Sequence, residues 1–298
     1  MTDPESPARG PVHGISTATP AAGREARVLR FSRRIPLIAG LSAVGVGFLL
    51  GLVIMVRAGG LPVELDEEWA EEVLTLHGPV GDVVALFMDW LGGGLMGVIV
   101  IPIGVAVLLI ALGRPWGALY FVLASALSAA AVQVLKEFFG RARPEDMLVT
   151  SDYGSFPSGH VANATTIAVA VAVLVPRAWV IVAGAAYVLL MAISRTYLGV
   201  HWITDTIGGM LVGAGAALIV WACLAIPLER ERQRRRARIS ARNADAAQSH
   251  VTPPERPRAP GGESAGGPPP GPSSGSRPGP TPGLPPGAGS GASDSSRT

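Results

Sequence analysis

Long apolar runs alternate with short polar connections between residues 35 and 228 of this 298-residue chain. The first run, residues 35–56, has the length of about 20 residues that an α-helix needs to cross a bilayer. Five more runs follow, at residues 93–112, 115–135, 161–175, 178–193 and 207–228. The fourth and fifth runs are short for a membrane span unless the polar residues beside them complete the helices at the membrane edge. The pattern predicts an all-α protein, a six-transmembrane helix bundle.

The segments outside these runs have a different composition. The first run is too long for the apolar region of a secretory signal peptide, so we expect it to be retained as a helix. Residues 1–34 and 229–298 hold most of the Pro, Ser and Arg. Such segments bury too little apolar surface to offset the entropy lost on ordering. We therefore predict three regions: a basic, disordered tail at 1–34, a membrane domain at 35–228, and a basic, then Pro/Gly/Ser-rich, disordered tail at 229–298.

Overall composition agrees with a membrane protein. The chain is 49% hydrophobic and only 15% charged, which excludes an ordinary soluble domain and a wholly disordered chain. Its one cysteine, Cys223, excludes an intrachain disulfide and a Cys/His zinc site. The net charge of +2 arises from basic clusters on both sides of the apolar block, which is typical of a membrane-orientation signal. We therefore expect no nucleic-acid partner.

The arginines also predict an orientation. If six helices alternate, one side carries the N-terminal arginines, Arg114, Arg177 and the run after residue 229. That side is expected to be cytoplasmic, together with both termini. The opposite side receives the acidic connection 57–92 and the connections 136–160 and 194–206. Within the first, residues 64–77 fit either an amphipathic helix on the outer membrane surface or a solvated connector.

Ionisable residues gather at the predicted outer ends of spans three to six: Lys136, Arg141, Arg143, His160, Arg195, His201 and Asp205. An ionisable side chain at the centre of a span costs about 2.5 to 3.5 kcal/mol on insertion. Several such groups on consecutive connections of one membrane domain therefore indicate a common purpose. Because most of them are cationic, they predict a site for an anion.

The first of these segments runs from residue 136 to residue 144. Lys136 and Arg143 are seven residues apart, which places both on one face of a helix that Pro144 ends. An alternative is that these are interfacial residues whose side chains reach to lipid head groups, an interpretation that Arg141 and Glu137 fit better.

The second and third segments add groups suited to phosphate chemistry. Ser158 is a natural N-cap, Gly159 allows close backbone approach, and the free N–H groups of the helix that follows suit an anion. A histidine such as His160 at a helix start often has only a structural role. His201 and Asp205 are four residues apart, so the carboxylate can hold one imidazole nitrogen protonated and leave the other free to attack. A helix cap with a neighbouring histidine is the alternative.

Taken in order, three motifs resemble the signature of the type 2 phosphatidic acid phosphatase superfamily, membrane lipid phosphatases related to vanadium haloperoxidases. They are Lys136-x6-Arg143-Pro144, Pro157-Ser158-Gly159-His160 and Ser194-Arg195-x5-His201-x3-Asp205. The resemblance covers residues 35–228. It implies that His201 is the nucleophile that forms a phosphohistidine, that Asp205 orients its ring, and that His160 protonates the leaving oxygen and then activates water.

The resemblance also implies how phosphate is bound. The binding groups would be Lys136, the chain's only lysine, with Arg143, Ser158, Gly159 and Arg195. Because three cations take the place of a metal ion, we expect neither a metal nor a cofactor. The expected substrate is a lipid phosphate or diphosphate of the polyprenyl diphosphate or phosphatidate type, hydrolysed at the outer face of the cell membrane. Two alternatives are a lipid phosphotransferase and a non-catalytic protein that binds lipid head groups.

Overall fold

The computed structural model describes residues 20–249, with side chains from residue 33 to residue 246. The disorder expected for residues 1–19 and 250–298 lies outside these residues. The secondary structure of the described residues is helical with no strand, as predicted. The elements in order are α1 (Pro20–Ala58), α2 (Glu64–Thr75), α3 (Pro79–Gly92), the π-helix η1 (Met96–Val100), α4 (Ile101–Ala111), α5 (Pro115–Phe139), α6 (Gly159–Leu174), α7 (Ala178–Tyr197) and α8 (Ile203–Ser249).

The described residues contain four helical segments that are long and apolar enough to cross a membrane: Arg33–Ala58, Pro115–Phe139, Ala178–Tyr197 and Ile203–Ala246. A fifth candidate is the pair Pro79–Gly92 and Met96–Ala111, which is bent by 48° at a short break. The helix Gly159–Leu174 is apolar but has only 16 residues. The structure therefore supports four or five spans by length, and the predicted count of six is not confirmed.

Three helix ends differ markedly from the prediction. Helix α3 begins at Pro79, inside the segment that we assigned to the outer connection. Helix α1 begins at Pro20 and α8 continues to Ser249, so residues 20–34 and 229–249 are helical rather than disordered. The extension of α8 is rich in Arg, Glu, Gln and Ala, which favour a helix even without an apolar face.

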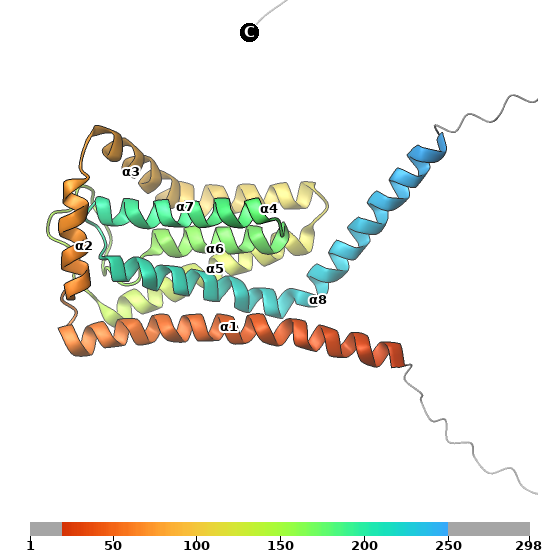
Figure 1. The fold of residues 1–298 in the computed structure, drawn as a ribbon, viewed down its shortest axis with the longest axis horizontal. Coiled ribbons are helices and arrows are strands. Elements are labelled where there is room, and N and C mark those ends of the chain that lie inside the picture. Colours follow the sequence, from red (N-terminus) through yellow and green to blue (C-terminus); the bar gives the residue numbers. More distant parts are fainter. Residues whose placement is uncertain (1–19, 250–298) are drawn as a thin grey trace, which may run out of the picture. The chain divides into compact units, whose positions relative to one another are not determined.

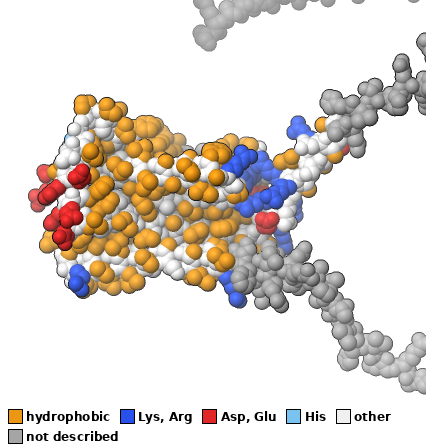
Figure 2. Space-filling model, viewed as in Figure 1, with side chains coloured by type: hydrophobic (Ala, Val, Ile, Leu, Met, Phe, Trp, Pro, Cys, Tyr) orange, Lys and Arg blue, Asp and Glu red, His pale blue; other side chains and the backbone are white. Residues whose placement is uncertain are grey.

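Antiparallel helices make up the apolar part of the molecule. Helices α4 to α7 lie side by side, and α1 runs along α8 (Figure 1). Small residues allow α1 and α8 to approach closely: a Cβ added to Gly40 would lie 2.9 Å from the backbone oxygen of Gly215. Hydrophobic side chains cover the sides of the bundle, acidic side chains gather at one end and basic side chains at the other (Figure 2).

Helix α2 lies across the acidic end of the bundle (Figure 1). Its buried Val73 packs with Tyr197, Leu198 and Val200 at the end of α7, and Trp69 Nε1 donates a 2.9 Å hydrogen bond to Thr196 Oγ1. Of the two alternatives for this segment, the structure has the helix, and the inward face of that helix packs on the protein.

Candidate active site

Arg143 joins the connection after α5 to the connection before α8. Its Nη1 atom donates a 2.5 Å hydrogen bond to the Val200 carbonyl and lies 3.4 Å from Nε2 of His201. The guanidinium therefore lies next to the imidazole nitrogen that the family resemblance makes the nucleophile.

Lys136 and Arg143 meet at one carboxylate, but they do not share a helix face as predicted, because α5 ends at Phe139 and Arg143 lies in the connection that follows. Lys136 lies in the last turn of α5, and its Nζ atom is 2.8 and 2.9 Å from the two carboxylate oxygens of Asp152. Arg143 Nη2 donates to Oδ1 of the same residue at 2.6 Å. Two cations that share one small anionic group can equally share the oxygens of a phosphate.

His160 and Arg195 form a second pair around Asp89 of α3. His160 Nε2 is 3.2 Å from the Asp89 carbonyl oxygen and 3.4 Å from its carboxylate Oδ1. Arg195 donates from Nη1 to the same Oδ1 atom. The carboxylate therefore holds His160 and Arg195 next to each other, although they come from α6 and α7.

His201 is almost fully buried and faces Asp205. Its Nδ1 atom is 3.5 Å from Asp205 Oδ2, so the two are paired electrostatically but are too far apart for a normal hydrogen bond. Burial lowers the pKa of His201 well below its usual value, and the charges of Arg143, Arg195 and Lys136 lower it further. The imidazole is therefore neutral at neutral pH, the form that can attack phosphorus.

Ser158 leaves its hydroxyl group unused. The residue is the N-cap of α6, as predicted, and its backbone N–H donates a 3.0 Å hydrogen bond to the Asp205 carbonyl. The Oγ atom is buried and has no hydrogen-bond partner. Since buried polar atoms are nearly always paired, this hydroxyl and the helix start at Gly159 suit an anionic ligand.

Arg141 does not contact lipid head groups, the role that the sequence analysis favoured for it. It is 2% exposed, and its guanidinium is 2.6 Å from a carboxylate oxygen of Asp66 on one side and of Asp205 on the other. A buried arginine paired in this way is part of the site's support and not a contact with lipid head groups.

The carboxylates that hold the site together were not predicted. Asp66 and Asp89 were counted only among the acidic residues of the first connection. Asp152 shares its connection with Glu145 and Asp146, and nothing in the sequence separates it from them. Only the folded chain shows which of these groups meet the cations.

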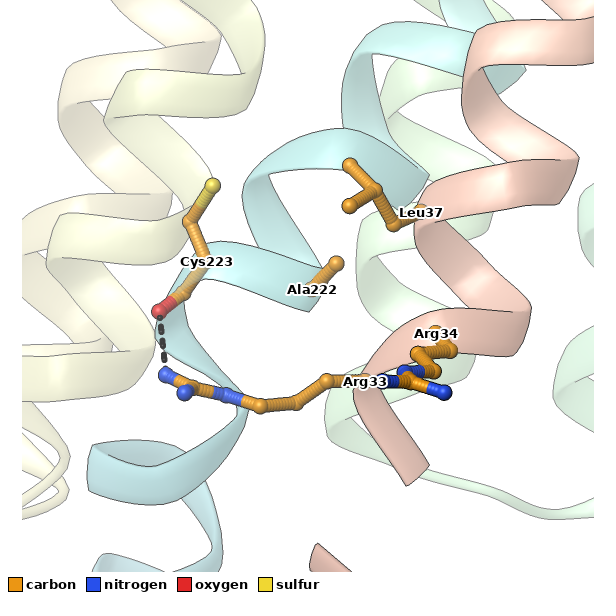
Figure 3. A pocket seen from close by; sticks show the side chains of 5 residues that line it. All are labelled: Arg33, Arg34, Leu37, Ala222 and Cys223. Atoms are coloured by element: carbon orange, nitrogen blue, oxygen red, sulfur yellow. Dashed lines mark hydrogen bonds between the residues drawn. The ribbon is translucent and has the colours of Figure 1, made fainter. Parts of the chain in front are cut away.

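A cavity of about 300 Å³ lies elsewhere, among Arg33, Arg34, Leu37, Ala222 and Cys223 (Figure 3). Arg33 Nη2 donates a 3.2 Å hydrogen bond to the Cys223 carbonyl across it. Cys223 is about 30 Å along α8 from the helix start next to His201. The candidate site is therefore assigned from the converging side chains and not from this cavity.

Comparison with known proteins gives a family match to the part of the chain that holds these residues. Residues 117–226 match the PAP2 superfamily, and all eight predicted site residues lie within this range. The residues Asp66 and Asp89 lie upstream of the matched PAP2 range.

Two curated proteins are similar to parts of this chain. Phosphatidylglycerophosphatase B of Bacillus subtilis is 33% identical over 110 residues, which are 34% of this chain and 54% of that protein. Undecaprenyl-diphosphatase of Sulfolobus acidocaldarius is 41% identical over 64 residues, 22% of this chain and 30% of that protein. The chain therefore spans about half or less of the length of these relatives.

A solved structure extends the similarity to the wider fold. The crystal structure of a transmembrane PAP2 type phosphatidylglycerolphosphate phosphatase from Bacillus subtilis is 26% identical, with a TM-score of 0.50. The similarity covers 61% of this chain and 93% of that chain.

Proposed function

We propose that the protein is a membrane lipid phosphatase that hydrolyses a phosphomonoester or diphosphate of a lipid through a phosphohistidine on His201. The observation that carries the proposal is the position of Arg143. Its guanidinium shares a carboxylate with Lys136 and lies 3.4 Å from His201 Nε2. A phosphate bound by the two cations would thus lie beside a neutral imidazole.

The first half of the reaction transfers the phosphoryl group. The phosphate oxygens take the place of the Asp152 carboxylate between Lys136 and Arg143. The lone pair of His201 Nε2 forms the N–P bond while the P–O bond to the lipid breaks, and His160 gives its proton to the leaving oxygen. The Asp205 carboxylate, 3.5 Å from Nδ1, stabilises the positive charge that develops on the ring.

The second half releases phosphate. His160, now neutral, accepts a proton from water as the water oxygen bonds to phosphorus and the N–P bond breaks. His201 returns to the neutral imidazole and His160 to its protonated form, so the cycle is closed. The three cations balance the charge on the phosphate oxygens in both steps.

The position of the site favours a lipid substrate at the outer face of the membrane. The site lies at the acidic end of the bundle beside a belt of exposed apolar side chains, and the basic side chains lie at the other end (Figure 2). By the positive-inside rule the basic end is cytoplasmic. We infer that α6, about 24 Å long, crosses the membrane together with its polar flanks, which gives six spans with both termini in the cytoplasm.

Two substrates are suggested by the relatives' names, phosphatidylglycerophosphate and undecaprenyl diphosphate. The test is to incubate the purified full-length protein in detergent with these two lipids, phosphatidate and a short polyprenyl diphosphate, and to measure free phosphate. We expect release from at least one lipid and none from His201→Ala. Equal release by wild type and His201→Ala, or transfer of the phosphoryl group to an added alcohol without free phosphate, would reject the proposal.

A further inference from the structure

Asp66 differs from the other acidic residues of α2 because its side chain is fully buried. Its neighbours Glu64, Glu67 and Glu68 are exposed. A buried carboxylate is costly unless hydrogen bonds and opposite charge compensate for the lost water. The partners of Asp66 therefore indicate what the residue is for.

These partners come from three parts of the chain. Asp66 Oδ2 accepts from Arg141 Nη2 at 2.6 Å and from the Val63 N–H at 3.2 Å. Asp66 Oδ1 accepts from the backbone N–H and the hydroxyl of Thr204 at 3.0 and 2.9 Å. One carboxylate thus ties α2 to the connection after α5 and to the first turn of α8.

The network continues from Arg141 to the histidine. Arg141 Nη1 donates to Asp205 Oδ1 at 2.6 Å and to Thr204 Oγ1 at 2.7 Å. The other oxygen of Asp205, Oδ2, accepts from the Trp202 N–H at 2.9 Å and lies 3.5 Å from His201 Nδ1. Arg141 therefore holds two carboxylates, one on the surface helix and one beside His201.

We propose that Asp66 is a positioning residue for His201, acting through Arg141 and Asp205; this rests on the proposed function of the site. The planar guanidinium is fixed at both ends by carboxylates, so its direction toward Asp205 depends on Asp66. Without the charge of Asp66, Arg141 Nη2 keeps only the 3.4 Å hydrogen bond to the Leu61 carbonyl, so the guanidinium is held less firmly against Asp205. Helix α2, which lies upstream of the matched family range, is then a working part of the site and more than a connector.

The test compares Asp66→Asn with Glu67→Gln. Both replace a carboxylate with an amide of the same size on the same helix, but Glu67 is exposed. We expect Asp66→Asn to lower kcat about 10- to 100-fold, the order of loss that small misplacements cause. KM should stay within about twofold, because Lys136, Arg143 and Arg195 do not contact Asp66. Glu67→Gln should behave like the wild type.

A double-variant cycle separates positioning from folding. If Asp66 acts through Arg141, adding Asp66→Asn to Arg141→Met causes no further loss of kcat. If Asp66 only supports the fold, Asp66→Asn lowers the melting temperature and leaves kcat per folded molecule unchanged. The losses of stability caused by Asp66→Asn and Arg141→Met then add in the double variant. Thr204→Val provides a milder variant, which loses the hydroxyl bonds to Asp66 and Arg141 and should lower kcat in the same direction. Unchanged kcat in both Asp66→Asn and Thr204→Val would overturn the proposal.

A second readout does not depend on activity. The imidazole nitrogens of His201 are observed by NMR in protein labelled with 15N-histidine. The signals that are missing from the His201→Ala spectrum are assigned to His201. We expect Asp66→Asn to shift both His201 resonances and Glu67→Gln to leave them in place. A wild type that releases no phosphate but shows this shift would reject the phosphatase and keep the positioning role. If the wild type releases phosphate but the His201 signals are the same in Asp66→Asn as in the wild type, the positioning role alone is rejected.

Discussion

Gly93 is the residue at which an added methyl group tests the role of His160 most directly. It follows α3 at the break before η1, and a Cβ built on it would lie 2.1 Å from His160 Nε2 and 2.4 Å from Cε1. The backbone φ of Gly93 is −127°, an angle that alanine adopts without strain. Gly93→Ala therefore perturbs the imidazole and not the chain conformation.

The displacement follows from the contact distance. An ordinary Cβ contact needs at least 3.4 Å, so the ring must move by 3.4 − 2.1 = 1.3 Å. Such a shift breaks the contacts of His160 with Asp89, which are 3.2 and 3.4 Å long. Misplacement by about 1 Å can cost about 100-fold in rate, within the roughly 100- to 10,000-fold that a general acid contributes. We expect kcat to fall about 100-fold, with KM nearly unchanged.

The assay is phosphate release from one lipid phosphate by wild type and Gly93→Ala in the same detergent. Gly104→Ala in α4 is the matched control, because its added Cβ meets nothing within 4 Å. An aryl phosphate, whose leaving group needs no proton, should be hydrolysed by Gly93→Ala with a much smaller loss. If Gly93→Ala keeps wild-type kcat, or loses the lipid and the aryl substrate equally, the assignment of His160 as general acid is refuted.

Three further predictions concern His201 and the cations. Rapid acid quench of wild type with 32P-labelled substrate should trap an acid-labile phosphoprotein that His201→Ala lacks; a label that persists in His201→Ala contradicts the mechanism. Only the neutral ring of His201 attacks, and burial lowers the pKa of this ring. Protonation of His201 should therefore reduce kcat/KM only below about pH 6.5, the usual pKa of histidine. A fall in kcat/KM that begins above this pH would contradict the burial of His201. Phosphate release should be unchanged by EDTA, since three cations take the place of a metal ion. Activity that is lost in EDTA and restored by added magnesium would contradict a metal-free mechanism.

The helices were predictable where the sequence is continuously apolar. The runs 115–135, 178–193 and 207–228 lie inside α5, α7 and α8. Helix α3 escaped prediction because Asp82 and Asp89 interrupt its apolar residues, and both are paired in the fold, with Tyr197 and with Arg195. The charged end of α8 escaped because its helix depends on local propensity and not on an apolar face.

The cations and histidines of the site were predictable because charge within an apolar domain is expensive and therefore has a purpose. Asp205 was predicted with them, but the other carboxylate partners were not, because Asp66 and Glu67 look alike in a list of acidic residues. One signal was nevertheless present. Asp66, Trp69 and Val73 have the spacing of one helix face, and Trp69 and Val73 pack inward on that face. A carboxylate on the apolar face of an amphipathic helix needs hydrogen bonds or a cation to compensate for the lost water. Arg141, which lies in the connection after α5, was a candidate that sequence analysis set aside.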